Sequence, residues 1–328
     1  MNLYVLENDF LKITLSDFGA NWLSCIVKLP NEQREVLVTT TPENWQQQTA
    51  YFGATVGRYA NRIANGRYTL NGKTYQLAQN NGENNLHGGN IGADKQLWQV
   101  ESYSSQAVRF SKTFANGEEG FGGEVKVTVD YRLAGNQLEI EFNALSNEDT
   151  PLALTNHAYF NLSGEPTIKN HLLKLNATHY LPVAENGIPN APLKAVQGTS
   201  FDFTQAKLIG RDLLSDADQQ AVRGYDHAFK LAKGSNDLTA CEAAATLTAN
   251  HLTLELRTTY PVLQVYTGNW LAGQPNLTGG VYEDHAGVAL EAGFYPDTPN
   301  HPEWWSVGGI TKANEPYHHK IQYRFIQS

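Results

Sequence analysis

The stretch VKVTVDYRLAGNQLEIEFNAL, residues 125–145, contains two runs in which apolar and polar side chains alternate. The apolar positions are Val125, Val127, Val129, Tyr131 and Leu133 in the first run and Leu138, Ile140 and Phe142 in the second. Successive side chains of a strand point to opposite faces, so a period of two indicates a strand with one buried face. Gly135 and Asn136 lie between the runs and are residue types typical of turns. The stretch therefore predicts two strands joined by a turn.

The same period of two recurs along the rest of the chain, in residues 11–15, 23–29, 252–256 and 321–325. Residues 67–77 form the clearest hairpin, because Asn71-Gly72 suits the positive φ angles of a type I′ turn. Helical segments are expected only at 206–214, at 216–222 and after Thr41-Pro42. Strands dominate, and no repeat or linker divides the chain. We therefore predict an all-β fold, a large antiparallel β-sandwich with a few short helices, in a single domain over residues 1–328.

The composition limits the classes of partner. The chain has 328 residues, a formal net charge of −9 and 17% charged residues. A negative chain without dense lysine and arginine clusters argues against nucleic acids and anionic membranes as partners. The first nine residues lack the basic and apolar regions of a secretory signal, and no apolar run approaches the length of a membrane span. Cys25 and Cys241 are far apart and are expected to be reduced thiols, so we predict a cytoplasmic protein.

Two stretches offer a candidate acid and base. Residues 155–162, TNHAYFNL, place His157 between amides and aromatic rings, where its pKa can be tuned for proton transfer near neutral pH. Residues 287–302, GVALEAGFYPDTPNHP, place Glu291 at the end of an apolar run, and loss of solvation there can tune a carboxylate as a base. A histidine near a strand is more often a packed structural residue, so neither stretch alone identifies a site.

Other local patterns concern binding or the absence of cofactors. The amide-rich and glycine-rich residues 80–89 suit the binding of a neutral polyol, but an ordinary surface loop explains their composition equally well. The chain has no phosphate-binding glycine motif, no H-E-x-x-H or CxxC spacing and no G-x-S-x-G elbow. Glu291 and Asp226 could be paired as glycosidase carboxylates, but nothing local ranks this pair above others. We therefore expect neither a metal nor a nucleotide cofactor.

Six segments resemble the galactose mutarotases (aldose 1-epimerases), in family order and across essentially the whole chain. They are residues 61–68 (NRIANGRY), 86–89 (LHGG), 155–162 (TNHAYFNL), 225–227 (YDH), 264–269 (QVYTGN) and 290–302 (LEAGFYPDTPNHP). The resemblance implies a large β-sandwich with an open sugar cleft and no cofactor. It implies an enzyme that interconverts the α and β anomers of galactose and glucose, with an aldohexose as its small-molecule substrate. It leaves the oligomeric state open, and we expect a monomer or a weak homodimer.

The roles of the family's residues follow position by position from this resemblance. Glu291 matches the general base and His157 the general acid. The sugar-binding positions are matched by Asn61, Arg62, His87 and Asp226, with Tyr159 and Gln264 as neighbours. Opening a pyranose ring removes the proton of the anomeric hydroxyl and protonates the ring oxygen, so an acid and a base suffice. As the acid, His157 has to be protonated near neutral pH, which predicts that nearby carboxylates raise its pKa.

Two alternative functions remain open at this level. A mutarotase of hexose 6-phosphates would carry extra cations for the phosphate, and Arg58 and Arg67 flank Arg62 in the sequence. A non-catalytic carbohydrate-binding protein would keep the cleft, but it would not require an acid facing a base.

Overall fold

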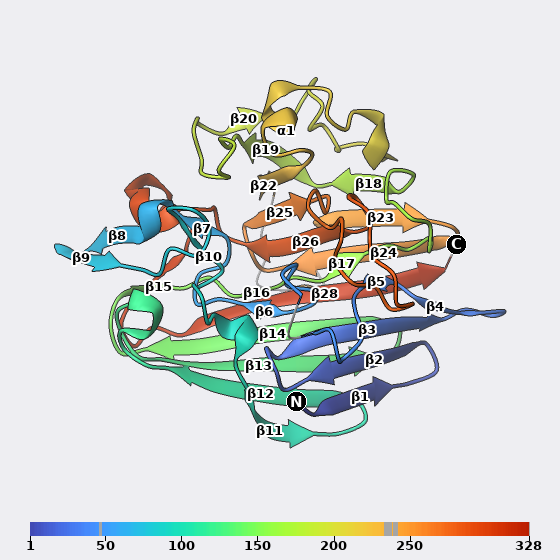
Figure 1. Ribbon diagram of the computed structural model, residues 1–328, viewed down its shortest axis with the longest axis horizontal. Coiled ribbons are helices and arrows are strands. Elements are labelled where there is room, and N and C mark those ends of the chain that lie inside the picture. The colour runs from blue at the N-terminus through green and yellow to red at the C-terminus, as the bar shows by residue number, and fades with distance from the viewer. Residues whose placement is uncertain (46–47, 233–237, 239–241, 328) are drawn as a thin grey trace.

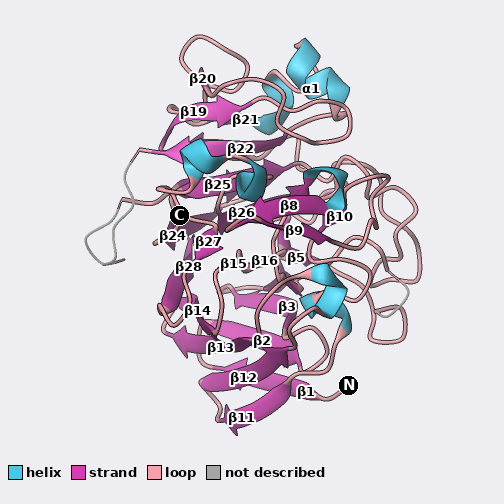
Figure 2. Ribbon diagram, turned by 90° about the vertical axis from the view of Figure 1, so that its left-hand side faces the viewer, coloured by secondary structure: helices cyan, strands magenta, loops and turns pink. Residues whose placement is uncertain are grey.

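Strands are the predominant secondary structure of the molecule, and its helices are short (Figure 1). The computed structural model describes residues 1–45, 48–232, 238 and 242–327. Within these residues the strands form sheets of nine, seven and four strands and four two-stranded ribbons, and the strand pairs of all of them are antiparallel. Figure 2 shows the strands stacked from the top to the bottom of the view, with most long loops on one side.

The nine-stranded sheet is the largest layer. Its order is β11 (Gln99–Tyr103), β12 (Ala107–Phe114), β13 (Val125–Ala134), β14 (Gln137–Ser146), β28 (Tyr317–Gln327), β24 (Leu252–Thr258), β23 (Ala245–Ala249), β18 (Leu172–Leu175) and β21 (Lys207–Leu208). The two predicted strands of residues 125–145 are β13 and β14, paired from Val125↔Ser146 to Ala134↔Gln137. This pair lies near the middle of the sheet, which explains its regular alternation of buried and exposed side chains.

Two smaller sheets form further layers. The seven-stranded sheet has the order β20 (Lys194–Ala195), β19 (Ala177–Leu181), β22 (Asp226–Leu231), β25 (Val262–Tyr266), β26 (Val288–Gly293), β17 (Tyr159–Phe160) and β5 (Leu37–Val38). The four-stranded sheet has the order β1 (Leu3–Glu7), β2 (Leu11–Ser16), β3 (Asn21–Lys28) and β4 (Gln33–Glu35). One buried apolar cluster joins all three sheets, because it contains Ile13 of β2, Val129 of β13 and Leu290 of β26.

The remaining elements are short ribbons and helical turns. The ribbons pair β7 (Arg62–Ile63) with β10 (Asn85–Leu86), β8 (Arg67–Leu70) with β9 (Lys73–Gln76), β15 (Thr150–Pro151) with β27 (Ile310–Thr311), and β16 (Thr155–Asn156) with β6 (Thr55–Val56). The helical elements are α1 (Ala217–Ala221) and the 3₁₀ turns η1 (Ala64–Gly66), η2 (Ala93–Lys95), η3 (Glu118–Gly120), η4 (Ile209–Arg211), η5 (Thr298–Asn300) and η6 (Pro302–Trp304). No helix among the described residues is long and apolar enough to cross a membrane.

The predicted all-β class and antiparallel sandwich are confirmed, and so is the hairpin at 67–77. Asn71 and Gly72, between β8 and β9, both have positive φ angles, as a type I′ turn requires. The single domain stays a prediction, which the shared core supports. Cys25 is buried and free, whereas Cys241 lies outside the described residues.

The helix predictions had mixed outcomes. The helix at 216–222 is confirmed as α1, and the Asp216 side chain caps it by accepting the Gln219 N–H at 3.2 Å. The prediction of a helix at 206–214 is wrong, because Lys207–Leu208 pairs as a strand with β18 and only a single 3₁₀ turn follows. Thr41-Pro42 opens a turn and no helix within residues 41–45.

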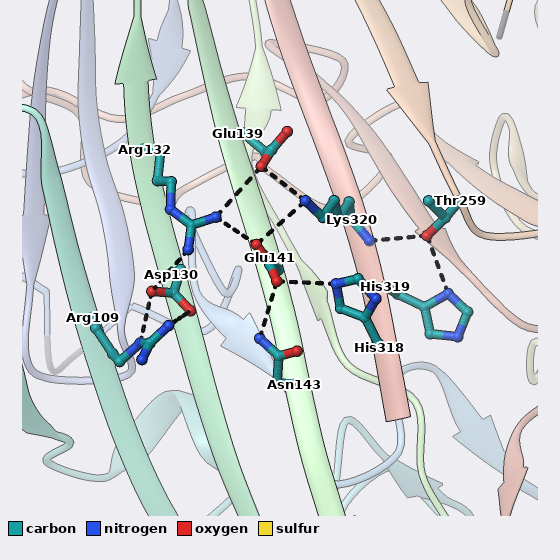
Figure 3. A network of polar contacts seen from close by, with 10 residues as sticks. All are labelled: Arg109, Asp130, Arg132, Glu139, Glu141, Asn143, Thr259, His318, His319 and Lys320. Carbon is teal, nitrogen blue, oxygen red and sulfur yellow. Dashed lines mark hydrogen bonds and ion pairs between the residues drawn. The ribbon is translucent and has the colours of Figure 1, made fainter. Parts of the chain in front are cut away.

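A network of charged side chains lies on the outer face of four neighbouring strands of the nine-stranded sheet, β12, β13, β14 and β28 (Figure 3). Cross-strand neighbours of opposite charge pair there, as in the double contact of Arg109 with Asp130 at 2.8 and 3.1 Å. Glu141 of β14 contacts Arg132, Lys320 and His318 of the neighbouring strands. We call these paired residues, with Glu139 and Asn143, the outer-face network.

Candidate active site

Three neighbouring strands of the seven-stranded sheet carry polar side chains on one face. Glu291 of β26 lies opposite Gln264 of β25, and Asp226 of β22 lies opposite Tyr266 of β25. Paired residues share a face, and Gln264 and Tyr266 are two positions apart, so all four side chains project to the same side. Val265 and Leu290 on the opposite face are buried in the core. The apolar face therefore anchors a polar face that forms the floor of a cleft.

A second wall comes from the ribbon of β7 and β10. Arg62 is the first residue of β7 and lies opposite Leu86 of β10. Asn61 precedes β7 and His87 follows β10, so the register of this short ribbon brings Asn61, Arg62 and His87 together. The cleft between the two walls is a cavity of about 510 Å³, which is within the size range of small-molecule sites.

His157 and Glu291 meet at the bottom of this cleft. The His157 Nε2 and Glu291 Oε1 atoms are 3.5 Å apart, and the two side chains are only 5% and 6% exposed. The backbone of His157 is fixed by two hydrogen bonds, from its N–H to the Ala54 carbonyl at 2.8 Å and from the Gly53 N–H to its carbonyl at 2.9 Å. An imidazole and a carboxylate at this separation can exchange protons with a molecule bound beside them.

Aromatic rings surround His157. The ring centroids of Tyr51, His87, Tyr159 and Tyr266 lie 5.8, 5.2, 4.9 and 6.5 Å from its own. Such surroundings disfavour a charged imidazole, and burial lowers the pKa of His157 to about 4. Burial also raises the pKa of Glu291 to about 8, with a smaller upward contribution from the charge of Asp226 and a downward one from Arg62. Between these two values the pair holds one proton.

The expectation that carboxylates raise the pKa of His157 is wrong, because the structure lowers it. The loss of hydration outweighs any attraction, because the nearest carboxyl group, that of Glu291, is itself protonated below pH 8 and presents no charge to the imidazole. The proton is therefore held on the carboxyl side of the pair at neutral pH.

Arg62 and Asp226 form a second polar group on the cleft wall. Arg62 Nη1 lies 3.9 Å from Asp226 Oδ2, and Arg62 Nε donates to Asn81 Oδ1 at 3.0 Å. Gln264 Nε2 donates to Asp226 Oδ1 at 2.6 Å. These contacts orient the guanidinium and the carboxylate while leaving other donor and acceptor positions open to a ligand.

Seven of the eight predicted site residues line the cavity: Asn61, Arg62, His87, His157, Tyr159, Asp226 and Glu291. Gln264 does not line it. It lies behind Asp226 and fixes that carboxylate, so its contact with a ligand is indirect.

Sequence reasoning missed several lining residues. Tyr51 places its ring 4.6 Å from that of His87 and has a positive φ of 58°. Glu185 and Trp270 also line the cavity, and Trp270 is 62% exposed. Trp270 directly follows the quoted segment 264–269, which was the available signal for it. Tyr51 and Glu185 lie in no motif, so no signal pointed to them.

The amide-rich residues 80–89 are mainly structural. The Asn80 amide nitrogen donates to the carbonyls of Leu86 and Gly89, and its oxygen accepts from the Leu86 N–H. Asn85 donates to the Ala78 carbonyl at 2.7 Å. Asn81 alone of these three lines the cleft, where it holds Arg62. The interpretation as a polyol-binding loop therefore fails for most of its amides, because they stabilise the loop itself.

Three side chains in the cleft offer atoms that could ligate a metal. The candidate ligand atoms of His87, His157 and Glu291 all lie within 4.8 Å of one another. A metal-ligating histidine usually donates its second ring N–H to a fixed acceptor. Within the described residues, Nδ1 of His157 has no partner, and Nδ1 of His87 accepts a hydrogen from the backbone N–H of Asn61. Both imidazoles lack this support, which disfavours a metal. The absence of a metal or other cofactor stays a prediction.

Comparisons with known proteins agree with this geometry. The family model described as aldose 1-epimerase matches residues 2–324. An aldose 1-epimerase of Haemophilus influenzae is 45% identical, and the match covers 98% of this chain and 95% of that protein. A galactose mutarotase of Bos taurus is 39% identical, with coverage of 98% and 93%.

Solved structures give the same result. A GalM/aldose epimerase homologue from C. elegans superimposes with a TM-score of 0.91 at 28% identity and covers 99% of each chain. A galactose 1-epimerase from Lactobacillus acidophilus has a TM-score of 0.85 at 29% identity, with coverage of 99% of this chain and 94% of that one. The chain therefore belongs to the aldose 1-epimerase family and is an isomerase that acts on carbohydrates.

Proposed function

We propose that this enzyme interconverts the α and β anomers of D-galactose and of D-glucose by acid–base opening and reclosure of the pyranose ring. The observation that carries the proposal is the buried His157–Glu291 pair, 3.5 Å apart at the bottom of a 510 Å³ cavity. Relatives named galactose mutarotase and galactose 1-epimerase support the choice of hexose.

His157 and Glu291 together hold one titratable proton both before and after the ring opens. In the form that opens the ring, Glu291 is a carboxylate and His157 is an imidazolium. Glu291 takes the proton of the anomeric hydroxyl while His157 gives its proton to the ring oxygen, so the C1–O5 bond breaks and the C1–O1 bond becomes a carbonyl. The pair is then a carboxylic acid beside a neutral imidazole. Rotation about C1–C2 exposes the other carbonyl face, and the reverse transfers close the ring.

The pKa values describe the resting arrangement of this proton. The neutral arrangement is favoured, because burial opposes charge on both groups. A bound sugar adds hydroxyl donors beside the Glu291 carboxylate, and hydrogen bonds to a charged form favour it. Substrate binding therefore shifts the single proton toward His157, where the ring oxygen needs it.

We assign sugar binding to the cleft wall. Arg62 offers fixed N–H donors, and Asp226, held by Arg62 and Gln264, can accept from two sugar hydroxyls. His87 and Asn61 complete this wall, while the buried ring of Tyr159 packs against His157. Each contact positions the ring without taking part in proton transfer.

The charges of the cleft argue against a hexose 6-phosphate substrate. Among the described lining residues, Arg62 is the one cation, while Glu185 and Asp226 are acidic and Glu291 holds a proton at neutral pH. Arg58 is buried elsewhere and donates to the Gly123 carbonyl at 2.8 Å and to Thr150 Oγ1 at 2.6 Å. Arg67 is exposed on β8 and is not a lining residue. A dianionic phosphate would meet more repulsion than attraction.

A purely carbohydrate-binding role fits less well. Burying an imidazole and a carboxyl group together is costly, and binding alone does not require it. Clustered shifts of pKa are typical of catalytic sites. We further propose that the chain acts as one domain in the cytoplasm without a cofactor, as a monomer or a weak homodimer.

The test is polarimetry with freshly dissolved α-D-galactose and α-D-glucose. The expected result is rapid mutarotation by the wild type, equal mutarotation by Glu141→Gln in the outer-face network, and mutarotation slower by at least about 10²-fold by Glu291→Gln. Wild-type protein that binds galactose without accelerating mutarotation would instead support a carbohydrate-binding protein. Acceleration with galactose 6-phosphate alone would support the sugar-phosphate enzyme.

A further inference from the structure

A glycine in the loop that follows β19 lies against the guanidinium of Arg62. Gly187 is buried, although its neighbours Glu185 and Asn186 are exposed and line the cleft. A Cβ atom added at Gly187 would stand 2.6 Å from both Cζ and Nη1 of Arg62 and 2.8 Å from its Nε. A real Cβ atom does not approach other heavy atoms this closely. The observed contact therefore requires a residue without a side chain.

The three distances show which side of the guanidinium Gly187 covers. A position in the plane of the group, beside the edge between Nε and Nη1, would be farther from Cζ than from either nitrogen. The added Cβ is as close to Cζ as to Nη1, so Gly187 lies over the flat face of the group. The N–H donors of a guanidinium point outward within its plane. Gly187 therefore restrains the tilt of the plane without covering the donors.

Two side chains hold the same guanidinium at its edge. Asn81 Oδ1 accepts a hydrogen bond from Arg62 Nε at 3.0 Å, and Asp226 Oδ2 lies 3.9 Å from Nη1. These contacts set the direction of the donors within the plane. An N–H···O bond weakens steeply only below about 120°, so the two edge contacts alone leave the plane some freedom to tilt. The backbone at Gly187 removes this freedom on one side.

The loop around Gly187 is held by its own backbone. The Gly187 N–H donates to the Ala184 carbonyl at 2.8 Å, and the Ala184 N–H donates to the Ile188 carbonyl at 2.9 Å. Val183 and Pro189 form a bridge across the base of the loop. Gly187 has a φ of 73°, in the left-handed region that favours glycine. The backbone at Gly187 is therefore a fixed surface, and the long side chain of Arg62 is the flexible partner of the contact.

We propose that Gly187 is a positioning residue for sugar binding, whose backbone holds the guanidinium of Arg62 in the plane where its remaining N–H groups meet the hydroxyls of the hexose. The proposal rests on the proposed function, in which Arg62 binds the sugar. A side chain at position 187 pushes the guanidinium away from the loop. The displaced group then loses its contacts with Asn81 and Asp226 and presents its donors at the wrong angle.

Gly198 provides a matched control for this contact. It lies exposed in a turn after β20, its φ is 74°, and a Cβ added there would meet no heavy atom of the described residues within 4 Å. Gly187→Ala and Gly198→Ala therefore carry the same backbone cost and differ in the contact with Arg62. Gly187→Ala should raise KM for galactose about tenfold and keep kcat within about twofold of the wild type. Gly198→Ala should change neither constant. Equal effects of the two substitutions on KM, or a loss confined to kcat, would overturn the proposal.

Removal of Arg62 supplies the second arm of the test. In an Arg62→Ala enzyme the atoms that the new Cβ meets are gone, so adding Gly187→Ala should leave KM as it is in Arg62→Ala alone. Additive losses in the double variant would show that Gly187 does not act through Arg62.

Galactose affinity, measured by calorimetry on the same variants, gives a readout that needs no turnover. It should fall in Gly187→Ala, stay at the wild-type value in Gly198→Ala, and be equal in Arg62→Ala and the double variant. A wild type that binds galactose without catalysing mutarotation would refute the proposed function and leave this comparison of affinities intact. An affinity unchanged by Gly187→Ala would refute the positioning role by itself.

Discussion

Two of the histidine–glutamate pairs among the described residues, one on the outer face of the large sheet and one in the cleft, resemble each other in geometry and differ in their surroundings. On the outer face of the large sheet, His318 Nε2 and Glu141 Oε1 are 3.0 Å apart, and the side chains are 51% and 14% exposed (Figure 3). At the bottom of the cleft, His157 Nε2 and Glu291 Oε1 are 3.5 Å apart, at 5% and 6% exposure. Contact between the same two residue types therefore does not by itself define an acid–base pair.

The two carboxyl groups shift in opposite directions. Partial burial raises the pKa of Glu141, but hydrogen bonding by Arg132 and the charges of Lys320 and Arg132 outweigh it and lower the value to about 2. Burial raises the pKa of Glu291 to about 8, and the guanidinium that opposes this rise, that of Arg62, is shared with Asp226. The comparison of Glu141 with Glu291 shows that the number of neighbouring Arg and Lys side chains decides whether a buried carboxyl group stays ionised.

Removing the carboxylate of Glu291 and that of Glu141 in separate variants tests most sharply whether the two pairs differ in function. Glu291→Gln and His157→Asn should each lower kcat at least about 10²-fold while sugar binding stays measurable, because the proton is lost and the shape is kept. Their combined loss should be less than additive, since the transfer fails once either end is missing. Glu141→Gln, the matched change in the outer-face network, should leave kcat unchanged. A Glu291→Gln enzyme that keeps more than about a tenth of the wild-type kcat would remove Glu291 from the mechanism.

The paired charges of the two regions can be compared in the same way. Arg62→Ala and Asp226→Ala should raise KM for galactose by about tenfold to a hundredfold, because a hydrogen bond to a charged group contributes about 1.5–3 kcal/mol. Arg109→Ala, which breaks the double contact with Asp130 on the outer face, should leave KM as it is. Steady-state polarimetry over a range of sugar concentrations measures all three. Unchanged KM in both cleft variants would place Arg62 and Asp226 outside the binding site.

Stability should respond to pH with opposite signs in the two regions. The folded-state pKa of Glu291 is raised from 4.5 to about 8, so its contribution to stability is present below pH 4.5 and is lost as pH rises to 8. The glutamine introduced by Glu291→Gln cannot ionise. The melting temperature of this variant should therefore be about 2–4 °C above that of the wild type at pH 9 and nearly equal to it at pH 5.

Glu141 provides the opposite case. Its pKa is lowered, so its contribution is present above pH 4.5 and is lost toward pH 2. Glu141→Gln should melt about 1–2 °C below the wild type at pH 7, because partly exposed ion pairs contribute little. Melting curves of the three proteins at pH 5, 7 and 9 check both signs. A Glu291→Gln variant that is less stable than the wild type at pH 9 would show that the carboxylate is well solvated in the fold.

The smallest expected effect is that of metal removal. Exhaustive dialysis against EDTA should leave kcat and KM within experimental error of the untreated enzyme, because the chemistry assigned to His157 and Glu291 needs no Lewis acid. A loss of activity that a divalent cation restores would assign the cluster of His87, His157 and Glu291 to a metal.

The sequence predicted the strands well because their burial is periodic. The alternation in β13 and β14 reflects one face packed in the core and one covered by the outer-face network. The turn at Asn71-Gly72 is local chemistry and was equally predictable. The helix at 206–214 failed because pairing of Lys207 and Leu208 with the distant β18 overrides local preference.

The identity of the candidate acid and base was also predictable, but their ionisation was not. His157 and Glu291 stand out within long motifs, and the fold brings them together. The pKa of His157 depends on Tyr51, His87 and Tyr266, which come from three other parts of the chain. Desolvation by rings far apart in the sequence leaves no trace in any local pattern. Tyr51 escaped prediction because it lies in no motif, whereas Gln264 was predicted as a binding neighbour and instead holds the Asp226 carboxylate.

The most direct test of the account is the pH dependence of kcat/KM for galactose, which reports the free enzyme. Activity is expected to rise with pH around 4, where the pair loses its second proton, and to fall with pH around 8, where it loses its last one. Above pH 8 the decline should approach tenfold per pH unit. An acidic limit near 6.5, the ordinary pKa of histidine, or full activity persisting to pH 10 would contradict the claim that burial sets the proton content of the pair.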